Sequence, residues 1–296
     1  MTASSSRPGA PSHASLPPPS VGKLDKYVLA YATVEGLAVG RVRHWISFMM
    51  LSGALDQAAH QTGGPRFVVK GGVALELRLP GRARATDDLD VIVVCDEEDL
   101  VAAFDMALRA GYGDCTFTRR PDVHPLGDKG VRIWVQVAYR TQRWATIQVD
   151  LAHPDAADTE TERLGSIPLA RFGLRGPADV PCLSLRYHVA QKWHGMTRTM
   201  PGGAPNDRFR DAVDLLLLRD LVSPADLPAV RAACEETFHV RAEHAWPPPI
   251  ALPTHWEKPF AAMAAGLELS TPSLLDAERE LRAFLDVIRS ATDAQA

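Results

Sequence analysis

The sequence predicts an α+β protein in which a mixed sheet flanked by helices is followed by an all-helical C-terminal part. Between residues 67 and 151, apolar runs of strand length and stretches of alternating polar and apolar residues are interspersed with helical patterns. After about residue 176, apolar residues instead recur at helical spacing. We therefore expect a disordered tail over 1–22, a sheet-containing domain over 23–175 and a helical domain over 176–296.

The N-terminal region divides into a tail and a helix. Residues 1–22 are rich in Ser, Pro and Ala, and they offer too little apolar surface to offset the entropy lost on ordering. Residues 23–61 follow a helical pattern in which Val42, Ile46 and Met49 form one apolar stripe. The glycines and proline at 63–65 end this pattern, so we expect one helix before the first strand.

The central region carries the strands. Two apolar strands, over 67–69 and ending at Val94, enclose a short helical segment and a turn. A helix is expected over 96–111, because acidic residues occupy its first turn and a glycine its end. Further strands are expected at 116–119, 131–139, 145–151 and 168–174, with a hairpin turn around Arg143.

The C-terminal region is helical throughout. Leu185, Val189 and Trp193 are spaced i, i+4 and i+8, which predicts a helix with Ser184 as its N-cap. Four more helices are expected after this one, and a proline-rich break over 246–253 separates the second of them from the third. They are expected at 210–218, 223–238, 256–266 and 272–292.

Composition narrows the class of protein. The 296 residues are 46% hydrophobic and 23% charged, which is typical of a soluble globular protein, and the net charge of −4 does not by itself indicate nucleic-acid binding. The four cysteines are scattered without a C-x-x-C pair, which argues against zinc and against a disulfide framework. The sequence has no apolar run long enough to span a membrane and no signal-peptide pattern, so we expect a cytoplasmic protein.

The most informative segment runs from Phe67 to Val94. Asp88 and Asp90 stand two residues apart at the head of an apolar strand, so their side chains project to the same side. Such carboxylates repel each other unless a cation lies between them, and they suit Mg²⁺ or Mn²⁺ that also holds substrate phosphates. Upstream, Gly71 and Gly72 let backbone amides approach a phosphate with no Cβ in the way.

Two sequence blocks carry a family resemblance. K-G-G-x-A-L-x-L at Lys70–Leu77 is followed by R-x-[ST]-x-D-L-D at Arg84–Asp90. In this order and spacing they resemble the AbiEii family of toxins and their MenT relatives, which have a nucleotidyltransferase fold. The resemblance covers roughly residues 65–220. It implies metal-dependent transfer of NMP from an NTP to RNA, with the tRNA 3′ end as the expected acceptor, by a growth-inhibiting toxin with a cognate antitoxin.

The resemblance also implies roles for single residues. The expected metal ligands are Asp88, Asp90 and Asp150. The expected nucleotide-binding residues are Lys70, Gly71, Gly72, Arg84, Thr86 and Lys192. The expected catalytic set is Asp88, Asp90, Asp150, Lys192 and Asp211, in which Asp211 orients Lys192 or an arginine. Thr86 stands where some family members carry a hydroxyl that is phosphorylated to silence the toxin.

Several of these residues also have a plain structural interpretation. Asp150 shares a strand face with Thr146 and Gln148, and it also fits as an acid that caps its strand. Lys192 also fits a surface lysine lying along its helix. The spacing of Arg208, Asp211 and Asp214 also fits ordinary helix ion pairs. We expect the histidines at 124, 153, 188 and 194 to be ordinary surface or core residues, since no pair has a convincing metal-binding spacing. Candidates for an RNA-binding basic face are Arg119, Arg120, Arg140, Arg143, Arg198 and Arg208.

Three other functions fit parts of this pattern. One is a nucleotidyltransferase that acts on a small molecule such as an aminoglycoside, or on a protein hydroxyl. Another is a non-catalytic binding module, against which the set Asp88, Asp90, Lys192 and Asp211 argues. The third is a glycosyltransferase, whose D-x-D motif also binds metal and nucleotide, but which lacks a Gly-Gly turn about sixteen residues upstream.

Overall fold

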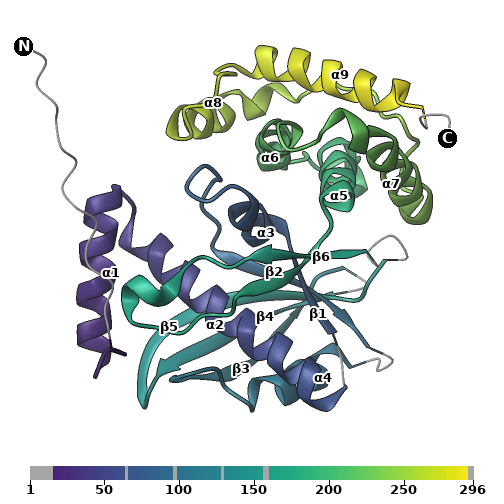
Figure 1. Ribbon diagram of the computed structural model, residues 1–296. Coiled ribbons are helices and arrows are strands. Elements are labelled where there is room, and N and C mark those ends of the chain that lie inside the picture. The colour runs from purple at the N-terminus through teal and green to yellow at the C-terminus, as the bar shows by residue number, and fades with distance from the viewer. Residues whose placement is uncertain (1–15, 64–65, 96–98, 128–129, 156–159, 293–296) are drawn as a thin grey trace, which may run out of the picture.

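A seven-stranded mixed sheet organises the chain (Figure 1), and the computed structural model describes residues 16–63, 66–95, 99–127, 130–155 and 160–292. The strand order is β3-β4-β5-β2-β1-β7-β6. The pairs β2–β5 and β1–β7 are parallel, and the others are antiparallel. The strands are β1 Arg66–Lys70, β2 Asp88–Val94, β3 Cys115–Pro125, β4 Gly130–Tyr139, β5 Gln142–Ala152, β6 Thr161–Gly165 and β7 Asp179–Leu183.

Helices cover the sheet unequally. On one face, α1, α2 and α4 enclose a core with the inward residues of β1, β2, β4 and β5. On the other face, α3 and the C-terminal helices form a second core against β1, β2 and β7, and Figure 1 shows α5 to α9 as a layer beyond α3. The helices are α1 Val21–Glu35, α2 Val39–Thr62, α3 Gly71–Arg78, α4 Leu100–Leu108, α5 Leu185–Thr197, α6 Phe209–Arg219, α7 Leu227–Arg241, α8 Glu257–Gly266 and α9 Leu274–Ser290.

The outer face of β4 and β5 is more open than the rest of the sheet. Side chains on β4 alternate between buried residues such as Ile133 and half-exposed residues such as Arg132 and Trp134. The same alternation holds along β5. The half-exposed set continues directly from the start of β2 and the end of β5, so an open sheet face adjoins the predicted carboxylates.

Two expectations for the N-terminal region are wrong. The single helix over 23–61 is two helices, because Gly36, at a φ of 66°, caps the end of α1 in the left-handed conformation. Residues 16–22, predicted as tail, have defined roles: the Ser20 side chain caps α1, and the Tyr139 hydroxyl donates to the Pro18 carbonyl oxygen at 2.7 Å. Residues 1–15 of the predicted tail lie outside the described residues.

Other expectations need local correction. The strand expected over 168–174 is a short 3-10 helix at Leu169–Phe172. The β4–β5 turn falls at Arg140, whose φ is 54°, and Arg143 lies within β5. The helix expected over 96–111 begins at Leu100 with Asp99 as its N-cap, and residues 96–98 lie outside the described part. The sheet takes in β7, beyond the boundary predicted at residue 176.

Candidate active site

A row of charged side chains crosses the sheet where β1 ends and β2 begins. Strand register pairs Lys70 with Asp90, Asp90 with Asp150, and Asp150 with Arg132. Residues paired in this way project from the same face of a sheet. Four chain segments from residue 70 to residue 150 therefore bring a lysine, two carboxylates and an arginine side by side, with Asp88 two residues from Asp90 on the same strand.

The electrostatics of Asp90 indicate a cation-binding position. Burial, followed by the charge of Asp88, raises the pKa of Asp90 to about 6, although Lys70 acts in the opposite direction. Within the described part of the chain, no donor hydrogen-bonds the Asp90 carboxylate. The same part contains no ready-made group of three or more metal-ligating side chains. Two carboxylates with oxygen donors fit Mg²⁺ that takes its remaining ligands from substrate phosphates and water.

Glycines form a cradle against these carboxylates. Gly71 has a φ of 61°, and a Cβ at this position would lie 1.9 Å from Asp90 Oδ2. A Cβ on Gly72 would lie 2.5 Å from the Thr86 hydroxyl oxygen. The glycine pair is therefore required by close packing of the β1–α3 turn against the head of β2. It also brings the first backbone amides of α3 close to the carboxylates. These amides are at the N-terminal end of the helix, which favours anions.

Thr86 is held inside the site. Its side chain is buried, and its hydroxyl donates to Asp88 Oδ1 at 2.7 Å. We expected Thr86 to bind the nucleotide, but its hydroxyl is used to position Asp88. Its burial also means that a phosphorylating enzyme would reach this hydroxyl only after local opening.

The Thr86–Asp88 hydrogen bond gives a first prediction. Thr86→Val keeps the shape of the side chain and removes the hydrogen bond to a carboxylate, so we expect kcat/KM to fall about tenfold. Thr86→Ser keeps the hydroxyl and is expected to stay within about threefold of the wild type. Steady-state kinetics on both variants provide the check. Equal loss in both variants would show that packing, and not the hydroxyl, is what matters.

Asp150 is engaged by an arginine. Arg132 Nε and Nη2 donate to the two oxygens of Asp150 at 2.9 and 2.8 Å. The Asp150 hydrogen bond is also the largest influence raising the pKa of Arg132. Sequence reasoning identified Asp150 by its alternation but gave no signal for Arg132, because only strand register reveals the pair. In this structure the guanidinium occupies the carboxylate edge that a second metal would use.

Lys192 lies in a buried ion-pair network. Its Nζ is 2.8 Å from Asp211 Oδ1 and 2.8 Å from Asp214 Oδ2. Arg84 binds the same Asp214 through two hydrogen bonds of 2.8 and 2.9 Å. Arg208 Nε donates to Asp211 Oδ2. The expected orienting role of Asp211 therefore has a geometric basis, and the expected phosphate contact of Arg84 is replaced by its pairing with Asp214.

Oppositely charged side chains in this network counteract the effect of burial on the pKa values of Asp214 and Lys192. Burial alone would raise the pKa of Asp214, but Lys192 and Arg84 hold it below its ordinary value. Burial alone would lower the pKa of Lys192, but Asp211 and Asp214 hold it above its ordinary value. Asp214 and Lys192 thus both remain ionised at neutral pH. The network fastens α5 and α6 to the segment that leads into β2, which fixes Lys192 beside the carboxylate row.

A cavity of about 250 Å³ lies between the row and α5. Lys70, Gly71 and Asp90 line it from the sheet side, and Lys192 lines it from α5. The other lining residues are His188, Gln191, His194, Gly195, Arg198, Arg208 and Arg241. We expected His188 and His194 to be ordinary histidines, yet both line this cavity. The one sequence signal that could have marked them is their spacing: His188 lies four residues before Lys192, and His194 lies two residues after it on the same helix.

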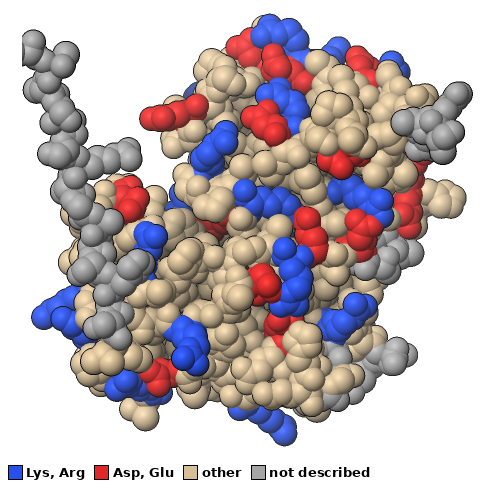
Figure 2. All heavy atoms as spheres, in the orientation of Figure 1, with Lys and Arg blue, Asp and Glu red and all other residues tan. Residues whose placement is uncertain are grey.

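The candidate basic residues do not gather in one place. Arg198 and Arg208 line the cavity. Arg143 precedes Asp150 by seven strand residues, a separation of about 23 Å. Arg119 binds Asp105 of α4, and so it faces the opposite side of the sheet. Figure 2 shows basic and acidic side chains intermixed over the face in view.

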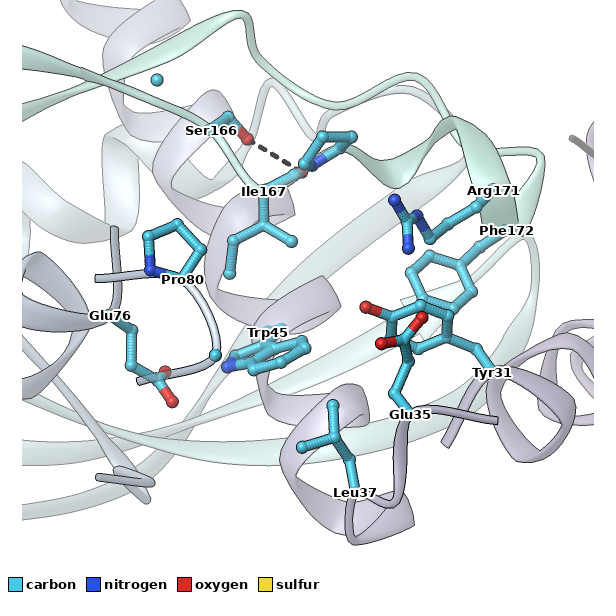
Figure 3. A pocket seen from close by; sticks show the side chains of 13 residues that line it. Tyr31, Glu35, Leu37, Trp45, Glu76, Pro80, Ser166, Ile167, Arg171 and Phe172 are labelled. Atoms are coloured by element: carbon cyan, nitrogen blue, oxygen red, sulfur yellow. Dashed lines mark hydrogen bonds between the residues drawn. The ribbon is translucent and has the colours of Figure 1, made fainter. Parts of the chain in front are cut away.

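A second cavity of about 350 Å³ shares no lining residue with the first. Figure 3 shows Tyr31, Trp45 and Phe172 around it, with Glu35 and Arg171 on one side. Tyr31 and Phe172 are in edge-to-face contact at 5.2 Å between ring centroids. Its aromatic walls, built from α1, α2 and the 3-10 helix, contrast with the basic lining of the first cavity.

Solved structures are similar to this chain to different degrees. MenT4, a nucleotidyltransferase toxin from Mycobacterium tuberculosis H37Rv, is similar with a TM-score of 0.60 and 18% identity, over 93% of this chain and 91% of that one. A nucleotidyltransferase-like antigen from Paracoccidioides brasiliensis gives 0.39 and 13%, over 65% and 89%. The antibiotic-resistance factor ANT(2'')-Ia gives 0.37 and 17%, over 68% and 97%. No curated protein sequence matches the chain.

A family model extends the similarity beyond the motifs. The model described as the nucleotidyl transferase AbiEii toxin of type IV toxin–antitoxin systems matches residues 53–289. This range extends past residue 220, where the resemblance seen in the sequence ends, and takes in α7, α8 and nearly all of α9. No helix in the described ranges is both long enough and apolar enough to cross a membrane. The expected fold and enzyme class are confirmed, and the chain belongs to the AbiEii family of nucleotidyltransferase toxins.

Proposed function

We propose that this toxin transfers NMP from an NTP to a hydroxyl of an RNA acceptor, the 3′ end of tRNA. The observation that carries the proposal is the charged row of Lys70, Asp90, Asp150 and Arg132 against the Gly71 cradle. A nucleotidyltransferase needs a place for a triphosphate, a divalent cation and an acceptor hydroxyl within reach of one another. The row and the cavity beside it supply candidate groups for all three.

The triphosphate belongs in the basic cavity. Lys70 and the first amides of α3 approach it from one side, and Lys192 and Arg208 approach it from the other. Asp88 and Asp90 would hold Mg²⁺ or Mn²⁺, which supplies neutralisation of charge on the phosphate oxygens. Thr86 positions Asp88, and the Gly71 backbone limits the position of Asp90. Most of the rate enhancement would come from this positioning.

In this proposal, Asp150 receives the acceptor's proton. Its two carboxylate oxygens accept hydrogen bonds from Arg132, which fix its orientation. Once the acceptor hydroxyl loses its proton to Asp150, its oxygen attacks the α-phosphorus. The bond from that phosphorus to the β-phosphate oxygen breaks, and pyrophosphate leaves. Arg132 retains its charge throughout and stabilises Asp150 between turnovers.

The open sheet face favours a macromolecular acceptor. Beyond Asp150, the half-exposed side chains of β4 and β5 offer Trp134, Gln136 and Gln148 next to Arg132. Trp134 packs edge-to-face with His124 of β3 at 5.1 Å. A half-exposed tryptophan beside polar groups suits stacking of an unpaired nucleotide, which is worth about 1–3 kcal/mol per base. The acceptor then approaches from the sheet face and the NTP from the α5 side.

This arrangement gives a second prediction. Trp134→Ala is expected to raise KM for RNA about tenfold, because a stacking surface is lost, and to leave KM for the NTP unchanged. Trp134→Phe keeps an aromatic face and is expected to restore most of the affinity. Steady-state kinetics with each substrate varied in turn separate the two constants. A rise in both KM values, or no change in either, would remove the sheet face from the proposal.

Label transfer tests the proposed function itself. Purified protein is incubated with total tRNA, Mg²⁺ and each α-labelled NTP in turn, with Asp88→Ala as the matched control. We expect label in tRNA with at least one NTP and none in the control. Label that appears in a small molecule such as an aminoglycoside, or in protein, would replace RNA with that acceptor. Absence of label in every fraction would contradict nucleotidyl transfer by this site.

A further inference from the structure

His188 is a buried histidine beside the active-site cavity. It lies on α5 four residues before Lys192, so the two side chains lie on the same side of the helix. Its side chain is 1% exposed, and it lines the cavity together with Lys70 and Gly71. Neither the charged row nor the ion-pair network of Lys192 uses it.

A neighbouring arginine fixes the tautomer of His188. Arg78 Nη1 lies 3.1 Å from His188 Nδ1. A guanidinium has no acceptor, so Nδ1 must accept and the ring proton must reside on Nε2. Arg78 is itself held in place by Glu162 and by the Leu183 carbonyl oxygen. Burial, and then the charge of Arg78, keep the pKa of His188 well below its ordinary value, so the ring stays neutral.

The Nε2 proton has no partner in the described part of the chain. A buried donor without an acceptor is costly, and native proteins keep such groups where a ligand or water completes them. Nε2 lies on the opposite edge of the ring from Nδ1, which faces Arg78. His188 lines the cavity, although Nε2 itself is sealed from solvent, so an acceptor atom of a bound molecule would complete Nε2 once the surrounding side chains shift slightly.

The charges around the cavity define that molecule. Lys192 and Arg208 are balanced by Asp211 and Asp214, and Arg241 binds Asp155. A bound polyanion is therefore met by partly compensated cations and by uncharged N–H donors, among them His188 Nε2–H. We propose that His188 Nε2–H donates a hydrogen bond to a triphosphate oxygen of the bound NTP. The identity of this ligand rests on the proposed nucleotidyl transfer.

Equilibrium binding tests the role of His188 without requiring turnover. Isothermal titration in Mg²⁺ uses the four α,β-methylene NTP analogues, which cannot release pyrophosphate. His188→Leu removes the donor, and we expect Kd for the preferred analogue to rise about tenfold. In His188→Gln the amide nitrogen lies near the position of Nε2, so Kd is expected to stay within about threefold. His239→Gln, an exposed histidine change on α7, is the matched control and should bind as the wild type.

Nitrogen NMR supplies a readout that a purely structural role would not change. The ¹⁵N spectrum of wild-type protein should show His188 as the Nε2–H tautomer, and the Nε2 signal should shift when the analogue binds. A Nδ1–H tautomer, or equal Kd values in wild type and His188→Leu with both folded, would overturn the proposal. Normal binding and RNA labelling by His188→Leu would overturn it while leaving the proposed function intact. If His188→Leu weakens analogue binding while wild type fails to label RNA, the proposed hydrogen bond from His188 is supported and the RNA acceptor is rejected. No binding of any analogue by wild type would overturn both.

Discussion

Asp90→Asn is expected to abolish nucleotidyl transfer and, in metal-free solution at pH 8, to raise Tm. Activity falls by at least about a thousandfold, because a cation clamp on the phosphates is worth several kcal/mol. The stability effect follows from the pKa of Asp90, which burial and Asp88 raise to about 6. An amide of the same shape removes the buried negative charge beside Asp88.

The sign of this effect depends on pH. The pKa of Asp90 in the folded protein lies above its value in the unfolded chain, so the folded state binds more protons between about pH 4 and pH 6. Stability from this group therefore falls as pH rises through that window, and the ionised form costs on the order of 3 kcal/mol above it. Thermal melts of wild type and Asp90→Asn at pH 4 and pH 8 should diverge only at the higher pH. Equal Tm differences at both pH values would reject this explanation.

Lys192→Met is expected to destabilise the protein by about 3 kcal/mol, as well as to impair catalysis. The substitution leaves Asp211 and Asp214 buried with one cation fewer, and breaking a buried ion pair typically costs about 3–5 kcal/mol. Arg84 and Arg208 retain their contacts, which keeps the expected cost at the lower end. In a chain of this size the change lowers Tm by roughly 6–12 °C.

A second substitution separates the charge effect from lost packing. Adding Asp211→Asn to Lys192→Met removes one unbalanced carboxylate, so the double variant should melt higher than Lys192→Met alone. Asp214 has a depressed pKa in the folded protein, so its contribution to stability is present above the unfolded pKa and is lost as pH falls through the folded value. A double variant no more stable than the single one would indicate that packing dominates.

The candidate carboxylates could be predicted from the sequence, because the alternation of side chains along a strand depends only on neighbouring residues. Asp88, Asp90 and Asp150 could be found from alternation within their own strands, and the Gly71–Gly72 turn from its chemistry. The helices of the C-terminal part also follow from spacing alone. By contrast, β6 and β7 were not predicted, because β6 has no buried residue and β7 contains Pro181.

Interactions between distant segments could not be read from local patterns. Arg132 reaches Asp150 only through antiparallel register, and Arg84 binds an aspartate 130 residues further along the chain. The two-helix N-terminal region depends on the left-handed conformation at Gly36, which the helical pattern of residues 23–61 did not indicate. The contact of His188 with Arg78 spans 110 residues, so sequence spacing gave the histidine no special role.

Binding of Mn²⁺ with nucleotide tests the central claim most directly. Electron paramagnetic resonance measures free Mn²⁺ during titration of the protein with and without an α,β-methylene NTP. The account predicts nucleotide-dependent Mn²⁺ binding by wild type, its loss in Asp88→Ala and Asp90→Asn, and its retention in the exposed control Asp122→Asn. Wild-type affinity for Mn²⁺ and nucleotide in both site variants would contradict the assignment of Asp88 and Asp90 as the cation-binding pair.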